Sequence, residues 1–459
     1  MQKKTRIESD SVGSLEIPED AYYGVQTLRG HNNFQITGVP VLWAFVENIV
    51  KIKKVAAKVN GENGYIPKEI ADSIVCACDE ILSGKHKKDF ITDALQGGAG
   101  TSMNMNANEV IANRASELLG GKKGEYLCHP NDHVNCSQST NDVIPTAGRM
   151  TALRLAEKLL KKLKTLKNAL EEKAKEFDDV LKMGRTQLKD AIPIRLGQEF
   201  RAYASAISRD SKRIENAVQE LRSVNLGGSA IGTSLNVGKA YLQTVVGELS
   251  KEFGGELVQA EDLIDGTQNA DVYAFVSGSL KACAVNLSKM CNDLRLMSSG
   301  PQTGFHEINL PAKQNGSSIM PGKINPVIPE VVSQVAFAVI GNDVTIAMAA
   351  EGGQLELNAF GPVIFYKLFE SFNCLTGAIE TLTKNCITGI TANRERCQEL
   401  VHRSVGIVTA LCPYLGYKKS AEIAKEALAK NVTVRELVLR YGLMDEKKAD
   451  ELLDPYAMT

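Results

Sequence analysis

The chain has 459 residues, of which 44% are hydrophobic and only 6% aromatic, and its formal net charge is −1. A chain of this length can bury a large core and suggests about three domains. The near-neutral charge gives no support to nucleic acid or an anionic membrane as a partner. No uninterrupted apolar run reaches the roughly 20 residues of a membrane helix, and the polar stretch MQKKTRIESD lacks the apolar core of a secretory signal. These features, with many Ala, Leu, Glu and Lys residues, favour a helical protein of the cytoplasm.

Ten cysteines are scattered along the chain without paired spacing. They favour buried or idle thiols in a reducing compartment over disulfides or a metal site. His129 and His133 are four residues apart, as two zinc ligands on a helix would be. However, Pro130 follows the first histidine, and the glutamate of the HExxH zinc motif does not follow it, so we expect no metal here.

Residues 1–143 combine short loops, glycine clusters and Asn-rich stretches, which predicts a mixed, mostly helical N-terminal domain. The pattern then changes at about Ala147. Apolar residues recur at three- and four-residue steps from Leu153 to Phe177, which indicates one apolar stripe on a long helix. Similar patterns predict helices over about 196–224 and 270–298, and further helices after Pro326 and Gln354.

Thirty helical residues span roughly 45 Å, so several such helices with short connections predict an elongated antiparallel bundle over 144–391. The short amphipathic helices of 392–459 predict a small C-terminal domain. The bundle helices carry apolar or small residues on more than one face, for example over 202–208 and 338–350. A helix that is apolar all round must be covered on all sides, which indicates self-association.

The segment 316–330, GSSIMPGKINPVIPE, is the most distinctive stretch of the chain. Its glycines and prolines predict a shaped loop rather than a continuous helix, and loops often carry function. Its chemistry is a serine hydroxyl beside the ammonium group of Lys323. A phosphate-binding P-loop is excluded, because Ser317 stands where that motif needs glycine and Ile324 where it needs Ser or Thr.

This segment resembles the signature of the aspartase/fumarase superfamily, whose members eliminate ammonia, water or a larger amine to release fumarate. The resemblance implies a mainly α, three-domain fold with a central long antiparallel helical bundle, divided as 1–143, 144–391 and 392–459. It also implies a small-molecule substrate, no organic cofactor, and a homotetramer whose active sites gather segments from three subunits. Four other stretches resemble the family in consistent order: RIESDSVGSLEIPEDAYYGVQT (6–27), GGAGTSMNMNANEV (97–110), HPNDHVNCSQSTND (129–142) and GRTQLKDAIPIRLGQEF (184–200).

Elimination from a 1,2-dicarboxylate requires a strong base and donors aimed at the carboxylate where negative charge accumulates as an aci-carboxylate dianion. The family motif implies that Ser317 is the base, acting as an alkoxide, and that Lys323 supplies positive charge and pairs with the substrate α-carboxylate. The implied substrate-binding residues are Asn325 and Thr186 at the α-carboxylate, Thr101, Ser139, Thr140 and Ser318 at the β-carboxylate, and Asn141 and Gln187 near the leaving amino group.

Several of these residues have structural alternatives. Thr101 follows a glycine turn and could be only a helix N-cap, and Ser139–Asp142 could cap the long bundle helix. The same hydroxyl can cap a helix and bind a substrate. His129 and Asn131–His133 match a stretch that forms a secondary anion site in fumarases, and a structural loop is an equal alternative here.

Flanking residues separate the branches of the superfamily. The PVIPE that follows Asn325, the AYYGVQTLRG stretch, the STND at 139–142 and Gln187 in place of histidine all resemble aspartases more than fumarases. Gln187 is neutral at all pH values and cannot shuttle a proton, which suits departure of ammonium better than departure of water. We therefore expect reversible elimination of ammonia from L-aspartate; fumarate hydration and a non-catalytic structural relative, such as a lens crystallin, are the alternatives. Ser234 departs from the glycine usual in AIGTGLN, which bears on loop geometry.

Overall fold

The computed structural model describes residues 4–459 and divides the chain into two compact units. Unit 1 contains the residues up to Leu160, Arg213–Lys281 and Ala338–Cys374. Unit 2 contains Lys161–Lys212, Ala282–Phe337 and Leu375–Thr459. The predicted domain boundaries at 143 and 391 stay predictions.

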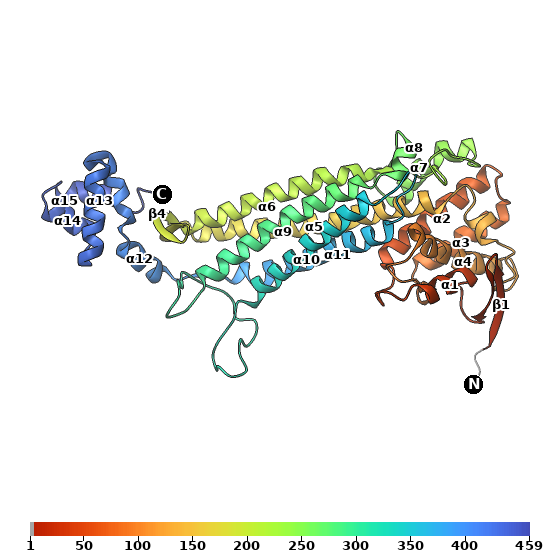
Figure 1. Ribbon diagram of the computed structural model, residues 1–459, viewed down its shortest axis with the longest axis horizontal. Helices are drawn as coiled ribbons and strands as arrows, with labels where there is room; N and C mark the ends of the chain where they lie inside the picture. Colours follow the sequence, from red (N-terminus) through yellow and green to blue (C-terminus); the bar gives the residue numbers. More distant parts are fainter. Residues whose placement is uncertain (1–3) are drawn as a thin grey trace. The chain divides into compact units, whose positions relative to one another are not determined.

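Long helices dominate the chain and confirm the mainly α fold class: α5 (Thr140–Glu176), α6 (Leu196–Gln219), α9 (Asp271–Met297), α10 (Val327–Glu351) and α11 (Gly361–Asn385) (Figure 1). Their segments pack side by side within each unit. In unit 2, Tyr203 of α6 donates a hydrogen bond to Asp293 of α9 at 3.0 Å. In unit 1, Ser277 of α9 donates to Asp343 of α10 at 2.8 Å. Together with the bond from Asn286 of α9 to Asp210 of α6 at 2.9 Å, these polar contacts help to fix the register of the helices.

Unit 1 also holds a helical layer whose buried side chains form one core, including Val50 of α2, Ile74 of α3 and Ile111 of α4. The hairpin β1–β2 is antiparallel, whereas β5 and β6 form a two-stranded parallel sheet. The shorter elements of unit 1 are β1 (Thr5–Asp10), β2 (Gly13–Pro18), α1 (Val25–Asn33), α2 (Trp43–Glu62), α3 (Lys68–Leu82), α4 (Thr101–Leu118), the π-helical turn η3 (Pro130–Val134), β5 (Ser223–Val224), α7 (Lys239–Phe253), β6 (Val258–Gln259) and α8 (Leu263–Gln268).

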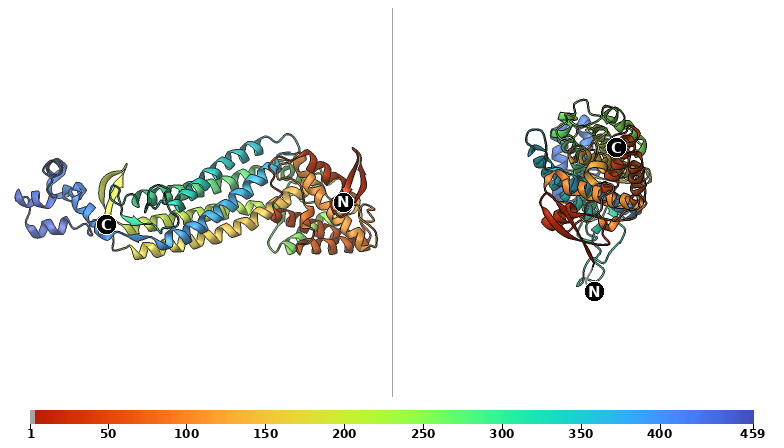
Figure 2. Two further views of the ribbon diagram at one scale, coloured as in Figure 1. Left: turned by 90° about the horizontal axis from the view of Figure 1, so that it is seen from below. Right: turned by 90° about the vertical axis from the view of Figure 1, so that its right-hand side faces the viewer.

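Unit 2 contains the antiparallel hairpin of β3 (Leu181–Thr186) and β4 (Lys189–Arg195), and β7 (Ile308–Asn309) pairs with β8 (Thr391–Ala392). The C-terminal helices form a compact group, drawn in blue in the left view of Figure 2. Leu411, Ile423 and Leu437 are among the residues of their own apolar core. These helices are α12 (Arg394–Arg403), α13 (Cys412–Lys430), α14 (Val434–Arg440) and α15 (Glu446–Leu452).

Two predicted segment limits were wrong. The segment 316–330 is not a loop throughout, because the helix predicted after Pro326 is α10, which begins at Val327 and includes Pro329 in its first turn. Proline is tolerated there, since the first amides of a helix have no partner within the helix. The helix predicted over 196–224 ends at Gln219 and is followed by a 3-10 turn over Glu220–Arg222.

Helix α10 is the one helix among residues 4–459 that is long and apolar enough to cross a membrane by length and composition, and 39% of its most apolar window is buried. Polar residues interrupt it. Asn342 donates to Ser371 of α11 at 3.1 Å, and the buried Asp343 accepts from Ser277. Such paired polar groups are typical of a helix packed among other helices.

Candidate active site

The candidate residues are divided between the two units. Unit 1 contains Thr101 and the residues Ser139–Asn141, and unit 2 contains the hairpin tip with Thr186 and Gln187 and the loop 316–325 with the other four.

Thr101 opens helix α4 directly after a sharply bent glycine turn. Gly98, Ala99 and Gly100 all have left-handed backbone, with φ of 74°, 53° and 97°. A side chain on Gly100 would meet Ile144 of α5 at 3.1 Å, so the turn also requires a small residue where two helices approach. The exposed hydroxyl of Thr101 donates to the Gly98 carbonyl at 2.5 Å and leaves its lone pairs available to a ligand.

Ser139–Asn141 form the start of helix α5. The Ser139 hydroxyl accepts a hydrogen bond from the Asn141 amide at 3.3 Å, and the Asp142 carboxylate accepts one from the Ser139 amide at 2.9 Å. These reciprocal bonds form a capping box, and they explain why the helix begins ahead of its apolar stripe. The predicted capping role of this stretch is therefore confirmed.

Asn104 connects the starts of α4 and α5. Its side-chain amide donates to the Thr140 hydroxyl at 3.2 Å. Because the Thr140 oxygen accepts this bond, its own proton remains free to be donated to another acceptor. Sequence reasoning missed Asn104, although it lies three residues after Thr101, on the same face of a helix. Unit 1 thus brings its candidate residues to one place.

A polar cavity of about 550 Å³ lies beside Thr101 and is also lined by His129 and Asn131. Arg29 lines it too, and binds Asp10 through two hydrogen bonds of 2.8 and 3.1 Å. This guanidinium lowers the pKa of Asp10 below its ordinary value. The Nδ1 atoms of both histidines accept backbone amide bonds at the turn η3, with His133 bonded to the His129 amide at 2.8 Å. The structural alternative for this stretch is therefore supported, and the anion-site alternative stays a prediction.

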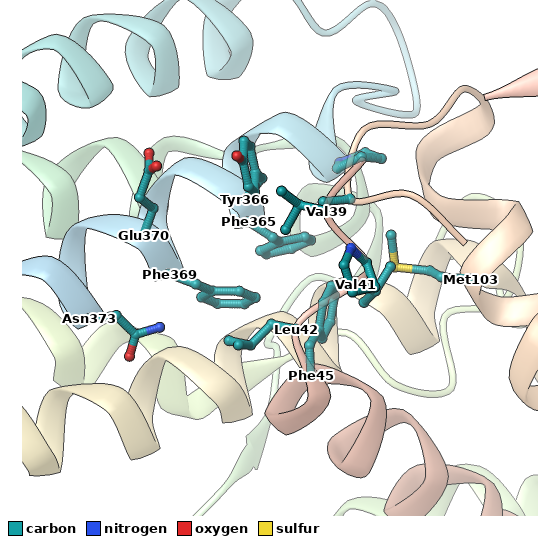
Figure 3. A pocket seen from close by; sticks show the side chains of 13 residues that line it. Val39, Val41, Leu42, Phe45, Met103, Phe365, Tyr366, Phe369, Glu370 and Asn373 are labelled. Atoms are coloured by element: carbon teal, nitrogen blue, oxygen red, sulfur yellow. The ribbon is translucent and has the colours of Figure 1, made fainter. Parts of the chain in front are cut away.

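A second cavity, of about 140 Å³, is apolar (Figure 3). Phe45 of α2 and Phe365 and Phe369 of α11 line it. None of the candidate residues is among its lining, and its chemistry offers few donors for a dicarboxylate.

In unit 2, the loop 316–325 is closed at its base by backbone and side-chain bonds. The Gly316 amide donates to the Lys323 carbonyl at 2.8 Å, and the Asn325 side chain donates to the Gly316 carbonyl at 2.7 Å. The Ser317 hydroxyl oxygen accepts from the amides of Ile319 at 3.2 Å and Met320 at 3.0 Å. Two such donors stabilise negative charge on this oxygen, as an alkoxide requires.

The rest of the loop is open to solvent. Ser318 and Lys323 are exposed, and the Ile319 side chain is 84% exposed. Within the described chain, no ion pair or hydrogen bond engages the Lys323 ammonium group, which therefore remains available to an anionic ligand.

Thr186 and Gln187 lie at the tip of the β3–β4 hairpin. Gln187 and Leu188 form its two-residue turn, with φ of 53° and 62°. Both left-handed conformations match a type I′ turn, which usually contains asparagine or glycine. Across residues 4–459, no hydrogen bond or ion pair joins Thr186 or Gln187 to the loop 316–325.

A buried ion-pair cluster holds strand β3 of this hairpin. Glu307 is fully buried and accepts from Arg185 at 2.8 Å, and the Lys182 ammonium group lies 3.4 Å from its other oxygen. The Arg185 guanidinium also stacks over the Phe305 ring at 4.1 Å. Sequence reasoning missed Glu307, because its partners lie more than a hundred residues away in the chain.

All ten cysteines are free thiols. Within residues 4–459, no group of three or more His, Cys, Asp or Glu side chains is arranged to hold a metal ion.

The chain matches two protein-family models, Lyase over residues 13–341 and Fumarase C C-terminus over residues 407–459. It is 50% identical to the aspartate ammonia-lyase of Bacillus subtilis over 459 residues, which cover 100% of this chain and 97% of that protein. The aspartate ammonia-lyase of Escherichia coli K12 is also 50% identical, with 98% of this chain and 95% of that protein covered.

Two solved structures share the fold. A fumarate lyase:delta crystallin from Brucella melitensis bound to cobalt has a TM-score of 0.96 at 49% identity, with 99% of each chain covered. A class II fumarase from Schistosoma mansoni has a TM-score of 0.95 at 35% identity, with 98% of each chain covered. The resemblance inferred from the motifs is confirmed: the chain belongs to the lyase family that contains the aspartate ammonia-lyases and class II fumarases.

Proposed function

We propose that the protein is an aspartate ammonia-lyase, which eliminates ammonia from L-aspartate reversibly to give fumarate. The observation that carries this proposal is identity of 50% to aspartate ammonia-lyases over the full chain, against 35% to a class II fumarase of the same fold. Gln187 at the hairpin tip supports it, because a neutral side chain suits release of ammonium better than of water.

In the proposed mechanism, Ser317 acts as an alkoxide and removes a proton from the β-carbon of L-aspartate. The electron pair moves onto the β-carboxylate and forms the aci-carboxylate dianion. Collapse of this dianion forms the carbon–carbon double bond and breaks the carbon–nitrogen bond, and ammonia departs. The amides of Ile319 and Met320 support the base by stabilising the charge on its oxygen.

The remaining candidate residues bind and orient the substrate in this proposal. Lys323, Asn325 and Thr186 hold the α-carboxylate. Donors at the starts of α4 and α5, together with Ser318 of the loop 316–325, hold the β-carboxylate. The partial positive charge of the helix N-termini also favours an anion. Asn141 and Gln187 contact the amino group. The β-carboxylate donors are Thr101, Ser139, Thr140 and Ser318.

We further propose that the active enzyme is a homotetramer of the cytoplasm, with active sites assembled from several subunits. Exposed apolar residues on α10 support association: Phe337 is 63% exposed and Met348 70% exposed in the single chain. Faces of this kind mark protein interaction sites. In this proposal the exposed apolar surface of α10 is covered by other subunits and not by membrane lipid.

The decisive experiment measures fumarate by its ultraviolet absorbance, with L-aspartate and L-malate offered separately to the purified protein. Product from L-aspartate alone is the expected result. Product from L-malate alone would make the protein a fumarate hydratase, and no product from either would favour the structural relative.

Ser317→Ala tests the base directly. We expect it to abolish turnover while folding and assembly stay intact, because alanine has no group that can take the proton. Ser205→Ala, at an exposed position of α6, is the matched control and should retain full activity. Normal turnover by the Ser317→Ala variant would remove this serine from the base role.

A further inference from the structure

A fully buried carboxylate lies directly behind the proposed substrate-binding residues of unit 1. Asp142 has no exposed surface. One of its oxygens accepts from the Ser139 amide at 2.9 Å. The other accepts from the amides of Gly227 at 3.0 Å and Ser229 at 3.1 Å. A capping box needs only the first of these bonds. The other two attach the start of α5 to a loop 85 residues further along the chain.

The same two segments are joined a second time through Asn141. Its side chain donates to the Ala230 carbonyl at 2.8 Å, and its own carbonyl accepts from the Asn225 side chain at 3.0 Å. The loop 225–230 is also held in an unfavourable conformation, because Ser229 is left-handed with a φ of 59°. A serine persists there only where surrounding bonds determine the backbone, as the Asp142 carboxylate does.

A buried lysine of α2 lies near this carboxylate, and burial lowers the pKa of the Lys53 amine to about 7 while the Asp142 charge opposes that shift. Lys53 of α2 is fully buried and donates to the Asn135 side-chain oxygen at 2.8 Å. That oxygen also accepts from Asn104, the residue that donates to the Thr140 hydroxyl. Burying either charge alone would be costly, so the two buried groups depend on each other. From α7, the buried Tyr241 also faces this carboxylate, and its hydroxyl has no hydrogen-bond partner within residues 4–459.

We propose that Asp142 is a positioning residue for the reaction: its ionised carboxylate holds Ser139, Thr140 and Asn141 against the loop 225–230 and thereby fixes the donors of the β-carboxylate and amino-group sites. This inference rests on the proposed function. Its physical basis is that donors displaced by even 1 Å lose much of their effect on a developing charge.

Protonation should release this attachment, because a neutral carboxyl presents an O–H donor toward backbone amides that need an acceptor. Burial raises the pKa of Asp142 to about 6, against the opposing effect of its backbone bonds and Lys53. The Michaelis constant for L-aspartate should therefore rise as the pH falls from 7 to 5, while the protein stays folded. A Michaelis constant that is flat over this range would overturn the proposal.

The variant Asp142→Asn keeps the size of the side chain but turns one oxygen into a donor that faces a backbone amide. We expect kcat/KM for L-aspartate to fall about a hundredfold, as small displacements of binding groups can cause. Asp445→Asn, at an exposed helix cap of unit 2, is the matched control and should keep wild-type kinetics.

A double variant separates positioning from loss of folding. Lys53→Met with Asp142→Asn removes both buried charges, so thermal stability should recover relative to Asp142→Asn alone. We expect the kinetic defect to remain, because the attachment to Gly227 and Ser229 is still incomplete. Recovery of kinetics together with stability would show that Asp142 matters only for folding and would overturn the proposal.

The wild-type protein, assayed in parallel, keeps the two proposals apart. Inactivity of the wild-type protein toward L-aspartate would contradict the proposed function. An active wild-type protein beside an equally active Asp142→Asn variant would contradict only the positioning role.

Discussion

At the scale of single residues, the candidate site combines the exposed ammonium group of Lys323 and the half-buried hydroxyl of Ser317 with backbone that is held in uncommon conformations. Ser317 receives two backbone donors from its own loop, and Lys323 is left without a partner along the described chain. Left-handed residues that are not glycine lie close to the candidate residues, among them Ala99, Gln187 and Ser229. Such conformations cost energy and are often found at functional sites.

Lys323→Ala should weaken substrate capture severely. The ammonium group is exposed and free of ion pairs in residues 4–459, so its proposed partner is the α-carboxylate. The expected result is a rise of about a hundredfold in the Michaelis constant for L-aspartate. A change of this size corresponds to the loss of one charge-assisted contact to the substrate. Lys313→Ala, an exposed lysine just before the same loop, is the control. An unchanged apparent affinity in the Lys323 variant would contradict the assigned contact.

Ser234→Gly should stabilise the protein. Ser234 has a φ of 55°, a conformation that glycine adopts without steric cost. Glycine removes backbone strain from the folded state, and it also raises the conformational entropy of the unfolded state. We expect the first effect to be larger, so the free energy of unfolding should rise by on the order of 1 kcal/mol. Urea denaturation at equal protein concentration measures the change. A lower denaturation midpoint for the variant would show that the contacts of the serine side chain stabilise the protein by more than the backbone strain destabilises it.

At the scale of elements, two of the three groups of candidate residues are held by a buried carboxylate. Asp142 attaches the start of α5 to the loop 225–230, and Glu307 anchors the β3–β4 hairpin through Arg185 and Lys182. Both carboxylates are fully buried, whereas Thr186 and Gln187 at the hairpin tip are exposed. Buried charges thus fix the backbone of both elements, while the candidate side chains are half-buried at the start of α5 and exposed at the hairpin tip.

Glu307→Gln should destabilise unit 2. The change leaves the Arg185 guanidinium without its buried counter-charge, whereas Lys182 keeps the Glu199 carboxylate at 3.0 Å. Removing one partner of a buried pair costs about 3–5 kcal/mol. The expected result is a lower midpoint of chemical unfolding. Asp179→Asn removes one partner of the exposed pair with Arg394 and should have little effect. Equal effects of the two variants would argue that the Glu307 cluster contributes no more than a surface ion pair.

At the scale of the whole molecule, the single chain leaves apolar helix surface uncovered. Along α10, Phe337, Val344 and Met348 are 63%, 57% and 70% exposed, at spacings that place them on one face of the helix. Burial of such a face removes roughly 25 cal/mol per Å² of unfavourable apolar exposure, which supports the proposed assembly of subunits.

The double variant Val344→Lys/Met348→Lys should prevent that assembly. Two ammonium groups would have to be desolvated in an apolar interface, so we expect a smaller species by light scattering and loss of activity together. Tyr417→Lys, at an exposed position of α13, is the control and should keep the wild-type size. A double variant of wild-type size would show that this face is not an interface between subunits.

Much of the fold and part of the site could be predicted from the sequence. The apolar stripe from Leu153 lies on α5 as far as Ala174, with Phe177 directly after its last residue, and the helix expected over 270–298 is α9. The five motifs indicated the family that the comparisons confirmed, and the loop with Ser317 was singled out by composition alone. These features are local: helix periodicity and motif spacing are written in consecutive residues.

The tertiary structure decided what depends on residues far apart in the chain. The sequence held no sign that Asp142 would bind amides of Gly227 and Ser229, or that Glu307 would anchor Arg185, because each pairing spans 85 residues or more. The sequence by itself therefore determined the helices, the family and the reactive loop. Only packing decided which buried charges hold the candidate residues in place, since the energy of a buried charge depends on every group that surrounds it and not on its neighbours in sequence.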